Sequence, residues 1–223
     1  MTFAEIMKMT GETLAMTLIS TLFAYLLGLP TGVLLNVTGK NGLRPCRWLN
    51  VIMGVIVNVL RSIPCLILIV ICMPWTRAWF PSGTGEWYTV LIPMTLCAFG
   101  FVARMVEQSL AEVPAGELEA VKSLGATNFQ LITKVLIPEA KVSLITGTAV
   151  VAVTILGYTS FAKDISAGGL ITGIYRYYNN HTSDFMSSWV FWVLTIVVIA
   201  ITQLLQEAGF IIAKKIDKRR LLK

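Results

Sequence analysis

Few residues in this chain have the types and spacing that enzyme chemistry needs. A G-K-N-G segment begins at Gly39, but it lacks both the spacing and the hydroxyl of a phosphate-binding loop. We therefore do not expect this chain to bind and hydrolyse ATP by itself. His181 is the only histidine, and no residue close to it in the sequence forms a plausible nucleophile pair with it. The sequence therefore predicts no catalytic site.

The cysteines and carboxylates restrict the chemistry further. The four cysteines form no C-x-x-C pair and three fall in apolar segments, so we interpret them as packing residues and expect no metal site. They are Cys46, Cys65, Cys72 and Cys97. The cores of the apolar segments hold no Asp or Glu, which a proton-coupled carrier normally needs. A sodium-coupled carrier stays possible, because backbone carbonyls can coordinate sodium.

Arg61 is the one charge in the core of an apolar segment. An unpaired charge at the bilayer centre costs at least about 2.5–3.5 kcal/mol, so its side chain should face protein or water. One interpretation is functional: Arg61 supports a pathway or an inner gate near Pro64. The other is structural and is the one we favour: Arg61 snorkels, or hydrogen-bonds to carbonyls that Pro64 leaves free.

The composition indicates an integral membrane protein. Hydrophobic residues make up 56% of the 223 residues and charged residues 13%, against about 25% charged in soluble proteins. We predict a single all-α domain over 1–223, a polytopic membrane protein with five transmembrane helices. Each predicted span has, or comes near, the roughly 20 residues that a bilayer requires. The spans are 13–39, 48–76, 87–110, 142–162 and 185–212.

The distribution of basic residues predicts the orientation. Six of the eighteen lie in the last ten positions, which is typical of a juxtamembrane tail and not of a nucleic-acid-binding protein. With the C terminus inside, thirteen basic residues are cytoplasmic, four are outside, and Arg61 is in the membrane. The positive-inside rule therefore predicts an outer N terminus and a cytoplasmic C terminus. The outer segment 163–184 is either a re-entrant or surface segment or, as we favour, a connector.

The cytoplasmic segment 115–141 is polar but retains helical order. Glu117–Leu124 favours a helix, and Gly125 stands where a left-handed C-terminal cap belongs. Thr127 and Gln130 have the spacing of a capping box and predict the start of a second helix. The segment therefore predicts a helix-turn-helix.

The second predicted helix carries an apolar stripe. Phe129, Ile132 and Leu136 recur at spacings of three and four residues, which favours one apolar face. Pro138 then breaks the pattern and is suited to the first turn of the next helix. The loop either folds onto its own helix ends or docks a soluble partner.

The same loop resembles the EAA motif of ABC importer permeases, which runs E-A-A, three residues, G, nine residues, I-x-L-P. The chain keeps Glu119, Ala120, Gly125 and Pro138, and its departures remain apolar: Val121, Val135 and Ile137. The resemblance implies that this loop couples to an ATPase. The candidate coupling residues are Glu119, Ala120, Gly125, Ala126, Phe129, Ile132, Val135, Ile137 and Pro138.

Further segments resemble the permease of methionine ABC importers. They are RSIP at 61–64, ARMVE at 103–107, SLGAT at 123–127, LIPEA at 136–140, GYTSFA at 157–162 and AGGL at 167–170. The resemblance implies a homodimeric permease in the bacterial inner membrane, with methionine, D and/or L, as the cargo. It also implies two cytoplasmic ATPase subunits that bind ATP and Mg, and an extracytoplasmic substrate-binding lipoprotein. We expect no cofactor in this chain.

The outer end of the fourth span offers a candidate gate. Tyr158, Ser160 and Phe161 follow Gly157 there, and the two rings are bulky enough to close a narrow passage against their copies in a dimer. Alternatively, both rings pack in the subunit core or at the membrane interface. We favour Phe161, which has no hydroxyl that needs a partner.

Two other classes of protein stay open. One is a self-contained secondary transporter or channel, and the other is a non-transporting membrane assembly or sensor subunit.

Overall fold

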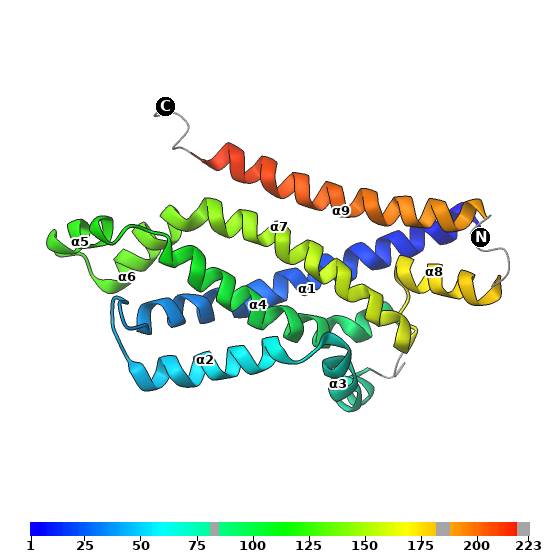
Figure 1. Ribbon diagram of the computed structural model, residues 1–223, viewed down its shortest axis with the longest axis horizontal. Coiled ribbons are helices and arrows are strands. Elements are labelled where there is room, and N and C mark those ends of the chain that lie inside the picture. The colour runs from blue at the N-terminus through cyan, green and yellow to red at the C-terminus, as the bar shows by residue number, and fades with distance from the viewer. Residues whose placement is uncertain (81–84, 182–187, 218–223) are drawn as a thin grey trace.

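The computed structural model describes residues 1–80, 85–181 and 188–217, and all regular structure in these ranges is helical. The long helices lie roughly side by side in an elongated bundle (Figure 1). Four helices of the described residues are long and apolar enough to cross a membrane. They are Phe3–Thr38 (α1), Trp87–Ala111 (a 3-10 turn, Trp87–Val90, and α4, Leu91–Ala111), Asn128–Ile165, and Trp189–Ile216 (α9).

Close packing of α1 on α4 forms the centre of the bundle. Gly28 and Gly32 lie one turn apart on α1, and a Cβ at Gly32 would stand only 2.5 Å from the carbonyl oxygen of Ala103. A Cβ at Gly28 would stand 2.6 Å from Val102. Small residues at this spacing let helix backbones approach, which is how membrane helices gain packing contacts. Val102, Ala103 and neighbouring α4 residues are consequently buried.

The segment expected as a single span at 48–76 consists of two helices. These are α2, Arg47–Ser62, and α3, Cys65–Trp79, and their axes are bent by 101°. Pro64 is the physical reason: it has no N–H and disfavours the helical conformation of the residue before it. Ile63 accordingly has φ −74° and ψ 122°. The fold has five candidate spans if this bent pair is counted as one.

The predicted apolar stripe of the second loop helix was wrong. Phe129 is 74% exposed, whereas Leu136 is 2% exposed, so the two do not share a face. The chain runs from α6, Asn128–Leu131, through a π-helical turn, Ile132–Leu136, into α7, Ile137–Ala162. The wide π turn places Leu131 and Leu136, five residues apart, on the buried side. Pro138 lies in the first turn of α7 and does not interrupt it.

The segment between α7 and α9 contains a helix, α8, Gly169–Asn180. Two side chains of α1 hold its start: Gly169 N donates to Glu12 Oε2 and Leu170 N donates to Thr13 Oγ1, both at 2.8 Å. Gly168 and Gly169 both have φ +81°, a conformation that favours glycine. The AGGL segment thus forms a turn that brings α8 onto α1.

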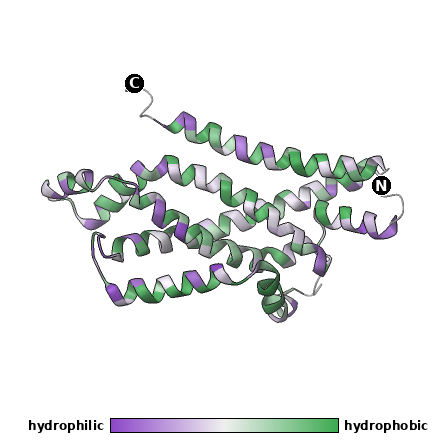
Figure 2. Ribbon diagram, viewed as in Figure 1, coloured by the Kyte–Doolittle hydropathy of each residue, from purple (hydrophilic) through white to green (hydrophobic). Residues whose placement is uncertain are grey.

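Different segments of the chain lie at the two ends of the bundle. The end of α1, the helix α5 (Ala115–Ser123), α6 and the end of α9 lie at one end, while the N terminus and α8 lie at the other (Figure 1). Figure 2 shows apolar residues along the long helices and many hydrophilic ones in α5, α6 and α8. The first residues of the predicted last span, 185–187, and part of the basic tail lie outside the described residues.

Candidate functional site

The turn between α5 and α6 has the geometry that its sequence predicts. Gly125 has φ +84°, and its N–H donates to the carbonyl of Lys122 at 3.0 Å. The capping box is also present, because Thr127 N donates to Gln130 Oε1 at 2.9 Å and Gln130 N donates to Thr127 Oγ1 at 3.3 Å. These local bonds fix the direction in which α6 leaves the turn.

The tip of this turn is apolar and uncovered. Leu124 is 86% exposed and Phe129 is 74% exposed, although both are large hydrophobic residues. α5 has no buried residue, so Glu119 and Ala120 are exposed as well. Exposed apolar groups next to charged ones are typical of a protein contact surface. The remaining coupling candidates are half-buried: Ala126, Ile132, Val135, Ile137 and Pro138.

An open groove runs between α4 and α7 behind this tip. It has a volume of about 330 Å³, and small or uncharged polar residues supply much of its wall. Its lining includes Gln108, Ser143, Thr146, Gly147 and Val150. Tyr25 joins α1 to α7, because its hydroxyl donates to the carbonyl of Leu144 at 3.0 Å.

A polar network joins α2 to α4 beside the groove. Arg104 on α4 donates from Nε to Asn58 Oδ1 at 3.1 Å and from Nη2 to the same oxygen at 3.0 Å. Nη2 also donates to the carbonyl of Gly54 at 3.3 Å, and Nη1 pairs with Glu107 at 2.5 Å. Only Gly54 and Val57 of α2 are buried, and Val57 packs with Ala103 and Phe99 of α4. The guanidinium adds polar bonds to this small apolar contact.

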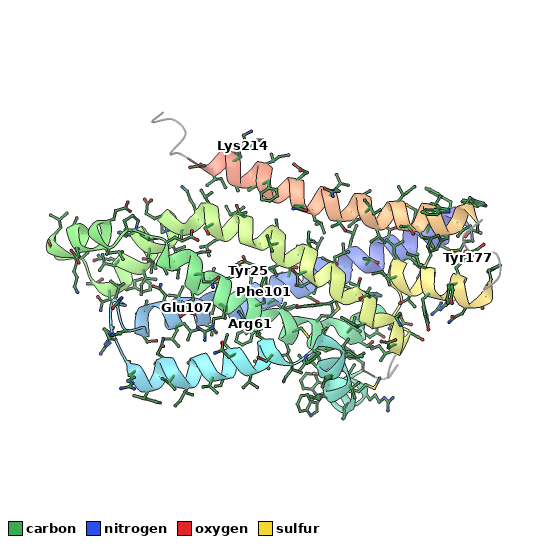
Figure 3. All side chains as sticks on the ribbon, viewed as in Figure 1. Tyr25, Arg61, Phe101, Glu107, Tyr177 and Lys214 are labelled. Carbon is green, nitrogen blue, oxygen red and sulfur yellow. The ribbon has the colours of Figure 1, made fainter. Side chains whose placement is uncertain are left out.

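Arg61 lies on α2, about one helical turn beyond Asn58. Its side chain is exposed and has no hydrogen bond or ion pair within the described ranges. Of the two structural alternatives, the bonds to carbonyls freed by Pro64 are therefore not formed there, and snorkelling stays a prediction. The α2 backbone approaches α4 closely at this point, since a Cβ at Gly100 would stand 3.1 Å from Arg61 N. Figure 3 shows Arg61, Phe101 and Glu107 along the side where α2 meets α4.

The candidate gate residues lie at the other end of α7. Tyr158 and Phe161 are half-buried and pack against the large core cluster of α1, α3, α4 and α7. Ser160 Oγ donates to the carbonyl of Gly157 at 2.7 Å within the helix. A half-buried ring is compatible with either gating or packing, so the role of Phe161 stays a prediction.

Comparison with known proteins identifies the family. Residues 24–218 match the family described as the binding-protein-dependent transport system inner membrane component. The chain belongs to this family. It is similar to the probable D-methionine transport system permease protein MetI of Pasteurella multocida, with 37% identity over 94% of each chain. It is 41% identical to MetI of Escherichia coli, over 67% of this chain and 68% of that one.

Solved structures give the same result for the fold. The chain superposes on a chain of the inward-facing MetNI methionine ABC transporter with a TM-score of 0.91 and 33% identity, over 97% of this chain and 98% of that one. An amino acid ABC transporter crystallised with histidines matches with a TM-score of 0.76 at 14% identity, which supports the fold alone. The family fold therefore extends over nearly the whole chain.

The network around Arg104 is the part of the site that sequence reasoning missed. The ARMVE segment at 103–107 resembles the family but does not by itself indicate a role for Arg104. The signal was present, because Arg104 and Glu107 are three residues apart on a helix and such pairs face each other. The partner Asn58 lies 46 residues away and has no local sequence relation to them.

Proposed function

We propose that this chain is the membrane permease subunit of an ABC importer that carries methionine, D and/or L, and that it has no enzymatic activity of its own. The observation that carries this proposal is the superposition on the MetNI methionine transporter over nearly the whole chain. The identity to named D-methionine permeases supports the same cargo. ATP and Mg are bound by a partner ATPase subunit.

Two copies of the chain form the pathway, with the groove between α4 and α7 of each copy facing the other. The α5–α6 tip docks an ATPase subunit through Leu124 and Phe129, whose exposure leaves their apolar surface available for a partner. Closure of the two ATPases on ATP moves the tips, and α7 transmits the movement because it continues directly from α6. An extracytoplasmic substrate-binding lipoprotein delivers the cargo to the outer end.

Copurification followed by mass spectrometry tests the proposal. The tagged chain should bring down an ABC ATPase in equal amount, and the reconstituted complex should take up methionine only with ATP and binding protein. Uptake by the chain without an ATPase would instead indicate a secondary transporter or channel. A copurifying protein that is not an ATPase, with no uptake, would indicate an assembly or sensor subunit.

The proposed orientation places the N terminus outside and the α5–α6 tip in the cytoplasm of a bacterial inner membrane. Cys46 tests it, because it is the only cysteine that is not buried. A membrane-impermeant thiol reagent should leave Cys46 unlabelled in intact spheroplasts and label it after permeabilisation. Labelling of Cys46 in intact spheroplasts would mean that the orientation is the reverse of the proposed one.

Phe161 is the proposed outer gate, with Tyr158 and Ser160 beside it. Phe161→Ala should leave the complex assembled but raise ATP hydrolysis without binding protein severalfold, or leak substrate, because the closed state loses its plug. Phe210→Ala is the matched control, since Phe210 is 40% exposed on α9. If Phe161→Ala matches the wild type in both basal hydrolysis and leak, the ring is ordinary packing.

A further inference from the structure

A basic pocket lies at the corner between α1 and α2, apart from the tip and the groove. It has a volume of about 530 Å³, and its lining joins the last turn of α1 to the first turn of α2. The lining residues are Thr38, Lys40, Pro45, Arg47, Asn50 and Val51. The pocket is held in shape by Asn50, whose Nδ2 donates to the carbonyl of Leu35 at 2.8 Å and to Thr38 Oγ1 at 3.1 Å.

The cations of this pocket form no ion pair within the part of the chain that the structure describes. Lys40 and Arg47 line it and Arg44 stands in the same loop, yet among the described residues none of the three has an ion pair or a side-chain hydrogen bond. The sequence between Glu12 and Glu86 contains no Asp or Glu.

The start of α2 adds to the positive potential. This helix has no side-chain cap and no acidic residue in its first turn. The first N–H groups of a helix lack intrahelical acceptors and carry a partial positive charge. Arg47 is the first residue of α2, so its charge lies on the same helix end as these N–H groups.

An apolar stripe on α2 leads away from the pocket. Trp48 is 68% exposed, and Val51, Ile52 and Val55 are also exposed at the spacing of one helix face. Val51 belongs both to the stripe and to the pocket lining. The stripe extends for about 10 Å at a rise of about 1.5 Å per residue. A ligand here meets positive charge at one end and an apolar surface along its length.

We propose that this pocket binds the phosphate-containing headgroup of an anionic phospholipid, with an acyl chain along the α2 stripe. Lys40 and Arg47 neutralise the phosphate, and Trp48 stands beside the acyl chain as aromatic residues do at membrane interfaces. The same cations suit a free phosphate, but the stripe gives an apolar tail a place that free phosphate does not need. The ligand thereby ties the α1–α2 corner to one leaflet.

Native mass spectrometry of the purified full-length protein tests the site with phosphatidylglycerol and phosphatidylcholine as probes. The wild type should retain phosphatidylglycerol selectively. Each juxtamembrane cation contributes about 1 kcal/mol to binding an anionic surface. Lys40→Gln or Arg47→Gln alone should therefore weaken retention about fivefold, and the double variant about thirtyfold. Arg77→Gln, which removes an exposed cation from α3 outside the pocket, should leave retention unchanged.

Four outcomes would overturn the proposal. Equal retention of the two lipids would mean that the pocket has no preference for phosphatidylglycerol. A loss of phosphatidylglycerol in Arg77→Gln equal to that in the pocket variants would mean the same. Displacement of the lipid by inorganic phosphate or glycerol phosphate at similar concentrations would mean that the site binds a free anion. Loss of lipid binding once the ATPase is bound would mean that the cations pair with protein carboxylates. Lys40→Arg should retain the lipid, which separates loss of charge from misfolding.

Discussion

Replacing Gly125 by valine should lower methionine uptake at least about tenfold while the chain still inserts into the membrane. Gly125 has φ +84°, where a non-glycine residue costs about 1–2 kcal/mol and a β-branched one is a genuine outlier. A Cβ there would meet no atom within 4 Å, so the cost is in the backbone and not in packing. The turn should open and move α5 away from the position that an ATPase needs.

Two variants make this prediction specific, with uptake and ATPase copurification as the measurements. Gly125→Asn should retain most uptake, because asparagine tolerates the left-handed conformation. Gly116→Val makes the same change within α5, where φ is not positive and no atom lies within 4 Å of a Cβ. It should leave uptake close to the wild type. Normal uptake in Gly125→Val would mean that this turn is not the coupling element.

Replacing Arg104 by alanine should lower uptake at least about tenfold without preventing ATPase binding. The guanidinium makes three hydrogen bonds to α2 and an ion pair with Glu107. Hydrogen bonds to charged groups contribute about 1.5–3 kcal/mol each. Only Gly54 and Val57 of α2 are buried, so losing these bonds should loosen the attachment of α2 to α4.

Spin labels on α2 and α4 provide the direct measurement, and the distance distribution between them should broaden in Arg104→Ala. Arg104→Lys keeps the charge beside Glu107 but loses the planar fork, so its uptake should be intermediate. Asn58→Ala combined with Arg104→Ala should lower uptake by less than the product of the two single effects, because both remove the same bonds. Arg77→Ala is the control. An unchanged distance distribution with normal uptake would contradict the role of Arg104.

The all-helical membrane fold, the family and the local geometry of the α5–α6 turn could be predicted from the sequence. These features depend on composition or on residues close in the chain. The cap of α6 needs only Thr127 and Gln130, three residues apart, and the positive φ of Gly125 is a local backbone property. Such signals do not depend on the rest of the fold and can therefore be read directly.

Features that depend on distant residues or on a change of helical period could not be predicted from the sequence. The π turn cannot be read from a 3.6-residue pattern, so the predicted stripe of Phe129 and Leu136 was wrong. The start of α8 depends on Glu12, 157 residues away, and the attachment of α2 depends on a bond from Arg104 to Asn58, 46 residues away. Polar groups buried in a helix bundle must find partners wherever packing places them, and packing is set by the whole chain.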